Sequence, residues 1–252
     1  RRLRGQEESF TMAGVDVDDD DEDAIPTVER ELARERKARK ETDRTKELLE
    51  WGAGVAYDPS EEGGDIWLVG GRKHDVSVFG CKSVRRWNDA TSDWDAMPSL
   101  RYERINCGAV QLGRKLYVAG GWHTTLTAMR NVEVLDLDNA SNIAEGQEGV
   151  WNFSVPMAKN RSALGMAVLD GTIYACGGWD EEGKTRRSME KWRPGMKKWE
   201  KCASMKCERN HFGFAAIGGR LIAAGGQDEH NRMYTSFEIY DPVEDKWASI
   251  TP

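Results

Sequence analysis

The chain has 252 residues, of which 39% are hydrophobic and 31% charged, and its formal net charge is −7 at pH 7. This length fits one large domain or two small ones, and no apolar run is long enough to span a bilayer. An acidic chain without clustered Lys and Arg is not typical of nucleic-acid-binding proteins. The first residues lack a secretory signal pattern and do not begin with Met, so we expect a fragment or processed form.

Five cysteines are spread along the sequence without a C-x-x-C pair. A disulfide framework needs a dense, even set of cysteines, and a zinc site needs closely spaced pairs. We therefore expect reduced thiols and a cytoplasmic or nuclear protein. The cysteines are Cys81, Cys107, Cys176, Cys202 and Cys207.

The N-terminal segment differs in composition from the rest. Residues 1–50 contain 16 acidic and 11 basic side chains, and residues 16–23 are almost all carboxylates. Such a run of like charges stays solvated. Residues 27–50 favour a helix but carry no continuous apolar stripe. We expect residues 1–50 to form a charged tail and linker that is partly helical or disordered.

The remaining 202 residues contain a fourfold repeat. Each copy has an apolar run that ends in a glycine pair, and a tryptophan follows 22 to 31 residues after the first glycine. The glycine pairs are Gly70-Gly71, Gly120-Gly121, Gly177-Gly178 and Gly225-Gly226, and the tryptophans are Trp94, Trp151, Trp199 and Trp247. An arginine stands 16 residues before three of the pairs, at Arg104, Arg161 and Arg209.

With these marks, residues 51–252 resemble the kelch repeat family, in which each unit of about 50 residues forms one blade of a β-propeller. The resemblance implies an all-β fold with four four-stranded blades, at about residues 51–98, 104–156, 161–203 and 209–251. In this sequence the first repeat has Gly54 where the others have the arginine, and the second lacks an aromatic residue seven positions before its tryptophan.

Physical chemistry supports a structural role for the repeated marks. Paired glycines let neighbouring backbone approach closely, and large aromatic side chains fill the space between adjacent sheets. We therefore assign the glycine pairs and tryptophans to the scaffold. Propellers have four to eight blades, so four units make either a closed four-bladed ring or, as we favour, an incomplete arc of a larger ring or a ring that a second chain completes. An incomplete ring predicts self-association.

Function must come from a site on this scaffold. The loops that join the second and third strands differ among the repeats and emerge on the same side as the links between blades, so they are candidates for recognition. Exposed Trp and Arg side chains often anchor protein interfaces. The predicted partner-binding face contains Arg72, His74, Asn106, Trp122, His123, Trp179, Asp180, His211, Asp228 and His230.

We interpret the chain as a non-enzymatic module that binds a partner protein or peptide, with no cofactor, metal or catalytic residue and no nucleic-acid or membrane partner. The resemblance implies substrate adaptor roles in ubiquitin ligases, or scaffold roles. The alternative is a small-molecule or metal-dependent enzyme with its site at the propeller channel. The loop histidines could bind a metal, but no close histidine pair or known catalytic motif accompanies them.

Overall fold

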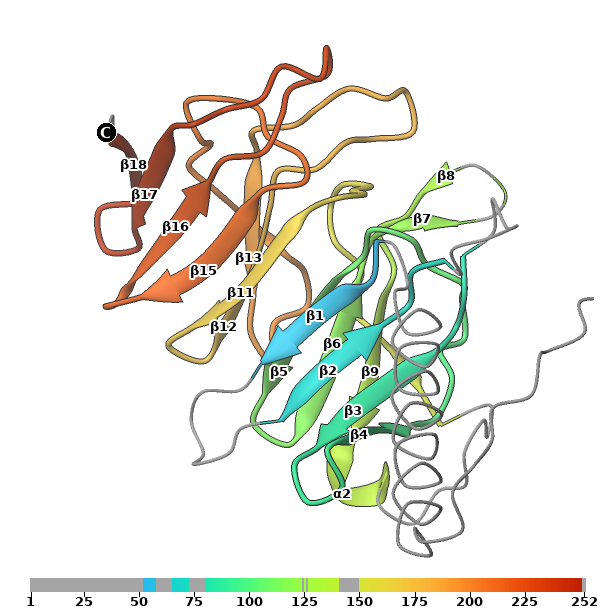
Figure 1. Ribbon diagram of the computed structural model, residues 1–252. Coiled ribbons are helices and arrows are strands. Elements are labelled where there is room, and N and C mark those ends of the chain that lie inside the picture. The colour runs from blue at the N-terminus through green and yellow to red at the C-terminus, as the bar shows by residue number, and fades with distance from the viewer. Residues whose placement is uncertain are drawn as a thin grey trace, which may run out of the picture. The chain divides into compact units, whose positions relative to one another are not determined.

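The computed structural model describes residues 52–57, 65–72, 80–123, 125, 127–140 and 150–250, which all lie in the unit Leu49–Pro252. Four antiparallel four-stranded sheets form the blades of a propeller (Figure 1), which confirms the all-β prediction. The described residues also contain one short helix, α2 (Leu137–Ala140), and none of their helices could cross a membrane. The tail expected over residues 1–50 lies outside the described residues.

Each blade contains four strands in chain order, and among the described residues a further pair of strands lies in the second blade. Blade 1 is β1 (Gly54–Tyr57), β2 (Ile66–Val69), β3 (Val84–Asn88) and β4 (Asp93–Ala96). Blade 2 is β5 (Gly108–Leu112), β6 (Lys115–Ala119), β9 (Val132–Asp136) and β10 (Asn152–Ser154). The loop between β6 and β9 contains the two-stranded ribbon of β7 (Trp122–His123) and β8 (Thr127–Ala128). Blade 3 is β11 (Gly165–Leu169), β12 (Thr172–Cys176), β13 (Met189–Trp192) and β14 (Glu200–Cys202). Blade 4 is β15 (Gly213–Ile217), β16 (Arg220–Ala224), β17 (Phe237–Asp241) and β18 (Lys246–Ile250).

The hydrophobic core lies between successive blades. One cluster joins blades 1 and 2, a second joins blades 2 and 3, and a third joins blades 3 and 4. The aromatic marks of the repeat lie in these clusters, where Trp192 stacks on Trp199 at 6.2 Å and Tyr240 packs on Trp247 at 5.3 Å between ring centroids. The tryptophans of blades 2 to 4 thus fill the space between sheets, as their size predicts.

Glycine pairs are required where one blade touches the next. Gly177 and Gly178 both have positive φ values, 63° and 82°. A Cβ atom at Gly177 would lie 2.5 Å from the carbonyl oxygen of Arg209 in blade 4, and one at Gly178 would lie 2.6 Å from that of Ser162. Both the backbone conformation and the close approach therefore exclude a side chain.

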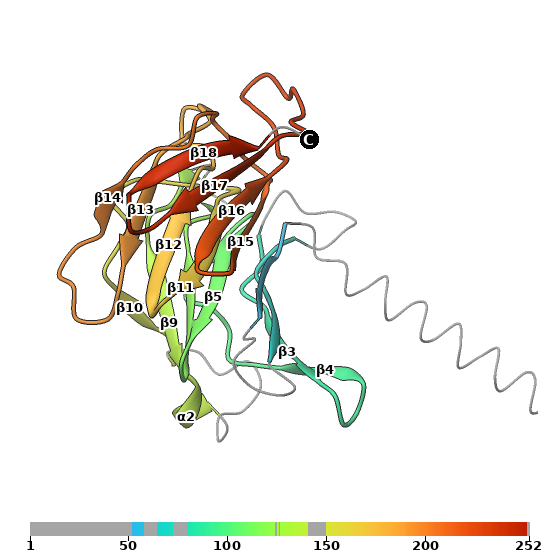
Figure 2. The same ribbon diagram turned by 90° about the vertical axis from the view of Figure 1, so that its left-hand side faces the viewer.

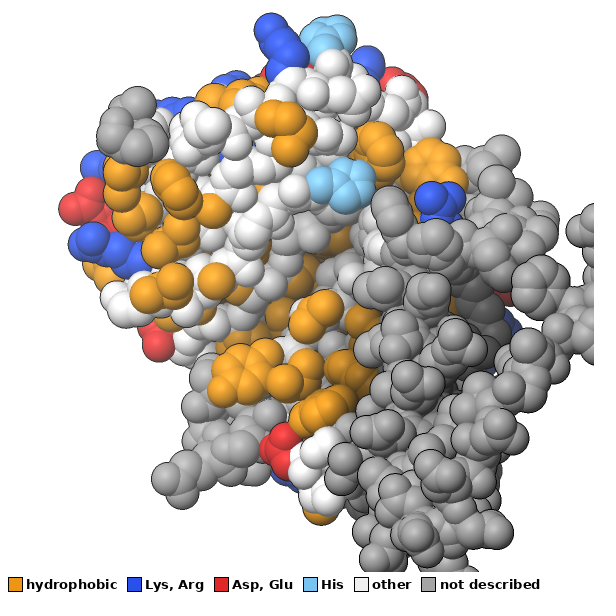
Figure 3. Space-filling view, in the orientation of Figure 1, with side chains coloured by type: hydrophobic (Ala, Val, Ile, Leu, Met, Phe, Trp, Pro, Cys, Tyr) orange, Lys and Arg blue, Asp and Glu red, His pale blue; other side chains and the backbone are white. Residues whose placement is uncertain are grey.

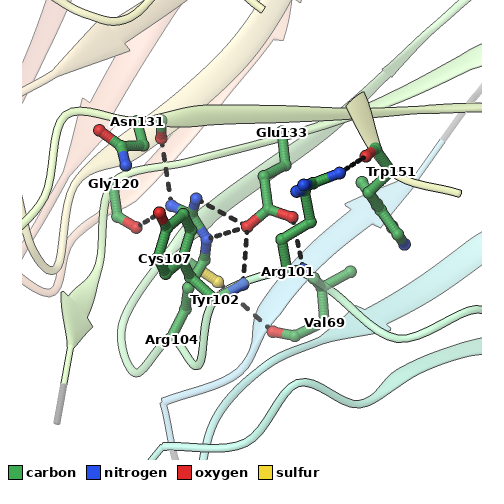
Figure 4. A network of polar contacts seen from close by, with 9 residues as sticks. All are labelled: Val69, Arg101, Tyr102, Arg104, Cys107, Gly120, Asn131, Glu133 and Trp151. Carbon is green, nitrogen blue, oxygen red and sulfur yellow. Dashed lines mark hydrogen bonds and ion pairs between the residues drawn. The ribbon is translucent and has the colours of Figure 1, made fainter. Parts of the chain in front are cut away.

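Each repeated arginine is buried in an ion pair within its own blade. Arg104 contacts Glu133 at 2.9 Å, with both side chains fully buried, and also donates to the carbonyls of Gly120 and Asn131 (Figure 4). The Glu133 carboxylate also accepts from the N–H of Arg101, in the link from blade 1. Equivalent pairs join Arg161 to Glu190 and Arg209 to Glu238. The arginines thus fix the link between blades, as expected for a structural role.

Blade 1 has the same strand register as the other blades but a longer connection between its first two strands. Gly54 pairs with Val69 directly before the glycine pair, and Gly108 holds the same position in blade 2 by pairing with Ala119. Gly54 is therefore the counterpart of Gly108 and not of Arg104, because the β1–β2 connection is longer. The position that corresponds to Arg104 falls at residue 50, outside the described residues.

The four blades do not close into a ring through their described residues. Blades 1 to 4 follow one another in chain order (Figure 1), but no hydrogen bond between described residues joins blade 4 to blade 1. Figure 2 shows the sheet of blade 4 with no other strand in front of it. Of the two arrangements that the sequence left open, the described residues follow the incomplete one.

Candidate partner-binding site

The variable loops lie beside the links between blades. Ile105, in the link to blade 2, forms an isolated bridge with Trp122 after the second glycine pair. Ser162 pairs in the same way with Trp179, and Asn210 with Gln227. Each bridge fixes the start of a variable loop against the entry to its own blade. The scaffold therefore presents these loops at one end of the blades, as the strand topology predicted.

A chain of backbone hydrogen bonds runs from blade to blade at this end. The N–H of Asn106 donates to Gly52 O at 2.6 Å, that of Ala163 to Asn106 O at 2.8 Å, and that of His211 to Ala163 O at 3.1 Å. All four residues have left-handed backbone, with φ between 49° and 71°. This conformation is uncommon for residues other than glycine, and its recurrence in every blade shows that the position serves the assembly of the blades.

A pocket of about 450 Å³ opens at this end. Its volume lies within the range of ligand-binding pockets. It is lined by Gly52, Arg72, Ile105, Asn106, Trp122, Trp179, Gly183 and His211. Five of these residues, Arg72, Asn106, Trp122, Trp179 and His211, belong to the face proposed from sequence, so the fold brings together side chains from all four blades.

Three aromatic rings line the pocket. The rings of Trp122 and Trp179 lie 6.4 Å apart between centroids, and the His211 ring stands edge-on to Trp179 at 5.6 Å. Both tryptophans are half-buried, so each packs on its neighbours and keeps part of its surface exposed. The Trp179 indole Nε1–H is buried and has no hydrogen-bond partner among the described residues. The pocket thus offers the exposed parts of the two indole rings as apolar surface.

His211 is held as a neutral side chain. The Asn210 amide group donates to Thr185 Oγ1 at 2.8 Å, which leaves its Oδ1 facing His211 Nδ1 at 2.8 Å. Because Oδ1 only accepts, Nδ1 carries the proton and Nε2 is the unprotonated nitrogen. Removal from water disfavours the charged imidazolium and lowers the pKa of His211 below its ordinary value.

This lowered pKa predicts a loss of stability in acid. The unfolded chain binds a proton at His211 more readily than the folded chain, so the stabilising effect of neutral His211 is present above about pH 6.5 and is lost as the pH falls through the folded pKa. We expect His211→Asn to reduce the dependence of the unfolding free energy on pH in that window. Asparagine suits this backbone conformation, as Asn106 shows at the equivalent position.

The measurement is urea unfolding of wild type and variant at several pH values above and below about 6.5. All other titrating groups are common to both proteins, so the difference between the two curves isolates His211. Parallel curves would contradict the prediction.

Two acidic residues of the predicted face, Asp180 and Asp228, make hydrogen bonds and ion pairs within their own loops. Asp180 is buried, accepts from the N–H groups of Glu182 and Lys184, and pairs with Arg186 at 2.9 Å. Asp228 is buried in the equivalent loop of blade 4. Burial opposes its ionisation, but hydrogen bonds from the backbone and guanidinium of Arg232 lower its pKa overall. Both carboxylates therefore stabilise loop conformation and lie away from the surface that a partner would contact.

Two other histidines of the predicted face, His123 and His230, are not among the residues that line the pocket. His123 lies edge-on to Tyr102 at 5.9 Å, and its Nδ1 is 2.9 Å from Thr125 Oγ1. His230 is exposed beside Glu229, and His74 lies outside the described residues. Within the described part of the chain, no three His, Cys, Asp or Glu side chains form a group able to hold a metal ion.

The buried cysteines are poor candidates for nucleophiles. Burial raises the pKa of Cys107 and of Cys202 to about 11, and it raises that of Cys176 further. Thiols with raised pKa values stay protonated at neutral pH and react slowly. All five cysteines are free thiols.

Fold and site together define a β-propeller of repeated blades with an aromatic pocket at one loop-lined end. The Kelch motif model matches residues 103–141, 160–206 and 208–252. The chain therefore belongs to the kelch repeat family.

Individual relatives share 26–30% sequence identity with about half of this chain. Kelch-like protein 23 from Pongo abelii is 26% identical over 136 residues, which cover 54% of this chain and 22% of that protein. Kelch-like protein 28 from Homo sapiens is 30% identical over 116 residues, or 46% of this chain and 19% of that protein. Kelch repeat and BTB domain-containing protein 1 from Ectromelia virus (strain Moscow) is 27% identical over 126 residues, or 50% of this chain and 21% of that protein.

The chain thus matches about a fifth of the length of these curated relatives. Among solved structures, YjhT has a similar fold, with a TM-score of 0.62 and 14% sequence identity over 79% of this chain and 68% of that one. Family and fold support a protein-interaction module.

Proposed function

We propose that residues 51–252 bind a partner protein or peptide by inserting one of its side chains into the aromatic pocket. The observation that carries this proposal is the convergence of Trp122, Trp179 and His211 from different blades on one pocket of about 450 Å³. Trp is among the residues that contribute most to protein interfaces, especially where a pocket excludes water. Half-buried aromatic rings favour an apolar or aromatic anchor side chain.

Polar groups at the pocket would orient the partner. The unprotonated Nε2 of His211 is an acceptor. The Arg72 side chain is exposed among the lining residues and provides a positive charge. A peptide that places a hydrogen-bonding backbone beside its apolar anchor fits this set of groups.

Within this function we assign the chain an adaptor or scaffold role, including substrate recognition in a ubiquitin ligase complex. Support comes from family membership and from a viral relative whose name pairs kelch repeats with a BTB domain. Free thiols at all five cysteines support a reducing compartment, the cytoplasm or the nucleus.

The test is selection of binding peptides from a displayed random library, followed by affinity measurement with single variants. We expect Trp122→Ala and Trp179→Ala each to weaken binding by at least about 30-fold, the loss of roughly 2 kcal/mol that is typical of a central aromatic anchor. Circular dichroism should stay unchanged, because half-buried rings contribute less to the core than buried ones.

Phe153→Ala is the matched control. Phe153 is an aromatic residue with 52% exposure that does not line the pocket. Its removal should leave peptide affinity unchanged. Peptides whose binding is equally insensitive to all three substitutions would place the interaction elsewhere and contradict the proposal.

A further inference from the structure

The three junctions between blades, which we call seams, are built in the same way. At each seam, the backbone N–H of the second glycine in a pair donates to the backbone carbonyl of the arginine at the start of the next blade. The pairs are Gly71 to Arg104, Gly121 to Arg161 and Gly178 to Arg209, at 2.7–2.8 Å. The indole of the next blade's tryptophan donates back, Trp151 to Pro98, Trp199 to Val155 and Trp247 to Ala203, at 2.8–3.0 Å. Apolar side chains fill the space between.

Blade 4 presents the first half of such a seam, and no described residue covers it. Ile217 is 61% exposed, whereas its counterpart Leu169 in blade 3 is 7% exposed. Phe237 is 41% exposed, whereas Met189 at the same position is 1% exposed. Ala215, another residue on this face, is also exposed. The face that blades 1 to 3 bury against the following blade is therefore uncovered in blade 4.

The hydrogen-bonding groups of this half-seam are also unused. Gly226 occupies the position of Gly178, yet its N–H meets no acceptor among the described residues. The carbonyl of His211 likewise receives no N–H, although Ala163 O and Asn106 O each receive one from the following blade. Blade 4 thus offers a donor and an acceptor where the other blades bind their neighbours.

Blade 1 presents the second half of a seam. Ile66 is 38% exposed, whereas Leu116, Ile173 and Leu221 at the same position are fully buried against the preceding blade. Val55 and Tyr57 lie on the same face with 63% and 58% exposure. Figure 3 shows hydrophobic side chains gathered over β1 and β2 and again over the sheet of blade 4.

Two donors of blade 1 complement the half-seam of blade 4. The Gly52 N–H corresponds to the N–H of Asn106 and donates to no described residue, so it could meet a carbonyl placed like that of His211. The Trp94 indole, which corresponds to that of Trp151, makes no hydrogen bond to a described residue. The two uncovered faces are therefore opposite halves of one kind of junction.

We propose that blade 4 of one copy of this chain docks against blade 1 of a second copy in a head-to-tail seam. At all three internal seams, the first half of the seam is covered by the second half, which belongs to the following blade. Blade 1 carries an uncovered second half of this kind. Head-to-tail contacts close into a ring or extend as a chain of copies. This contact uses backbone groups of Gly52 and His211, which also line the pocket, but not the Trp122 and Trp179 side chains, so variants of the two tryptophans test the proposed function without testing the seam.

The test is the size distribution of the full chain by sedimentation velocity over a range of concentrations. We expect assemblies of two or more copies. Ile217→Glu on blade 4 and Val55→Glu on blade 1 should each weaken self-association by at least about 10-fold, because each would bury an unpaired charge in the seam. Val243→Glu, at a position with 92% exposure in the β17–β18 turn, should leave it unchanged.

Mixing the two variants tests the direction of the contact. Ile217→Glu keeps an intact blade 1 and Val55→Glu keeps an intact blade 4, so each associates only weakly with itself, but together they can form one intact seam. We expect the mixture to give a 1:1 heterodimer at concentrations where each variant alone is mostly monomeric. A monomeric wild-type chain, a single variant that self-associates as tightly as wild type, or a mixture no more associated than the single variants would each overturn the proposal.

Discussion

Replacement of Arg161 by methionine is expected to lower the free energy of unfolding by about 3–5 kcal/mol, because it leaves a buried carboxylate without its partner. Arg161 lies 3.0 Å from Glu190, and both side chains are at least 96% buried. Its guanidinium also donates to the carbonyls of Gly177 and Ser188 at 2.7 and 2.9 Å. Burial lowers the pKa of Arg161, while the Glu190 charge acts to raise it, so the two charges depend on each other.

Urea unfolding followed by tryptophan fluorescence measures this loss. The double variant Arg161→Met/Glu190→Gln should recover part of it, because no uncompensated charge is then buried. Lys184→Met is the control, since Lys184 pairs with Glu182 at 3.2 Å with both side chains about two-thirds exposed. Such surface pairs contribute about 0–1 kcal/mol. A loss below about 1 kcal/mol for Arg161→Met would show that the pair does not hold the blade together.

Only the arginine of this ion pair could be recognised from the sequence. The arginines were evident from their constant distance to the glycine pairs, but the glutamates were not recognised as a mark. Each glutamate follows its arginine by 29 residues in all three blades. In a chain that is 31% charged, a recurring glutamate is difficult to distinguish from surface charge. Only the strand register shows that the two residues share a buried site.

The fold was predictable because its marks are unusual residues at fixed spacing. A glycine pair that needs positive φ and a tryptophan that fills a seam tolerate few replacements, so they persist in each copy. The counterpart of Gly54 was not predictable, because the longer connection between β1 and β2 puts a strand glycine, and not the arginine position, 16 residues before the glycine pair.

The pocket was only partly predictable. Sequence placed Trp122, Trp179 and His211 on one face, but their approach to each other depends on backbone hydrogen bonds between blades. The same position is Gly52, Asn106, Ala163 and His211 in the four blades, so no residue type marks it. From sequence, Asp180 and Asp228 are assigned to the partner-binding face because they lie in the loops that vary among the repeats. Asp side chains also accept hydrogen bonds from nearby backbone N–H groups, and that local chemistry buries both carboxylates.

Equivalent tryptophans of the repeat are expected to differ in their contribution to stability. Trp151 is fully buried, and its indole donates to Pro98 O at 2.8 Å across the first seam. We expect Trp151→Ala to cost about 3–5 kcal/mol. Trp94 is the counterpart in blade 1, where it is half-buried and packs edge-on against Trp87 at 5.4 Å. We expect Trp94→Ala to cost only about 0.5–1.5 kcal/mol, the contribution of an aromatic pair.

Unfolding of both variants in the Ile217→Glu background keeps the chain monomeric, so that a second copy does not cover Trp94. Trp151→Phe retains a ring but loses the indole donor, and it should fall between wild type and Trp151→Ala if burial and hydrogen bonding both contribute. The repeat alone predicts equal losses at Trp94 and Trp151, since both hold the same place in the motif. Equal losses of unfolding free energy in the two variants would mean that other residues cover Trp94 even in the monomer. A larger loss for Trp151→Ala would show that a tryptophan of the motif stabilises the fold only where it packs against a preceding blade.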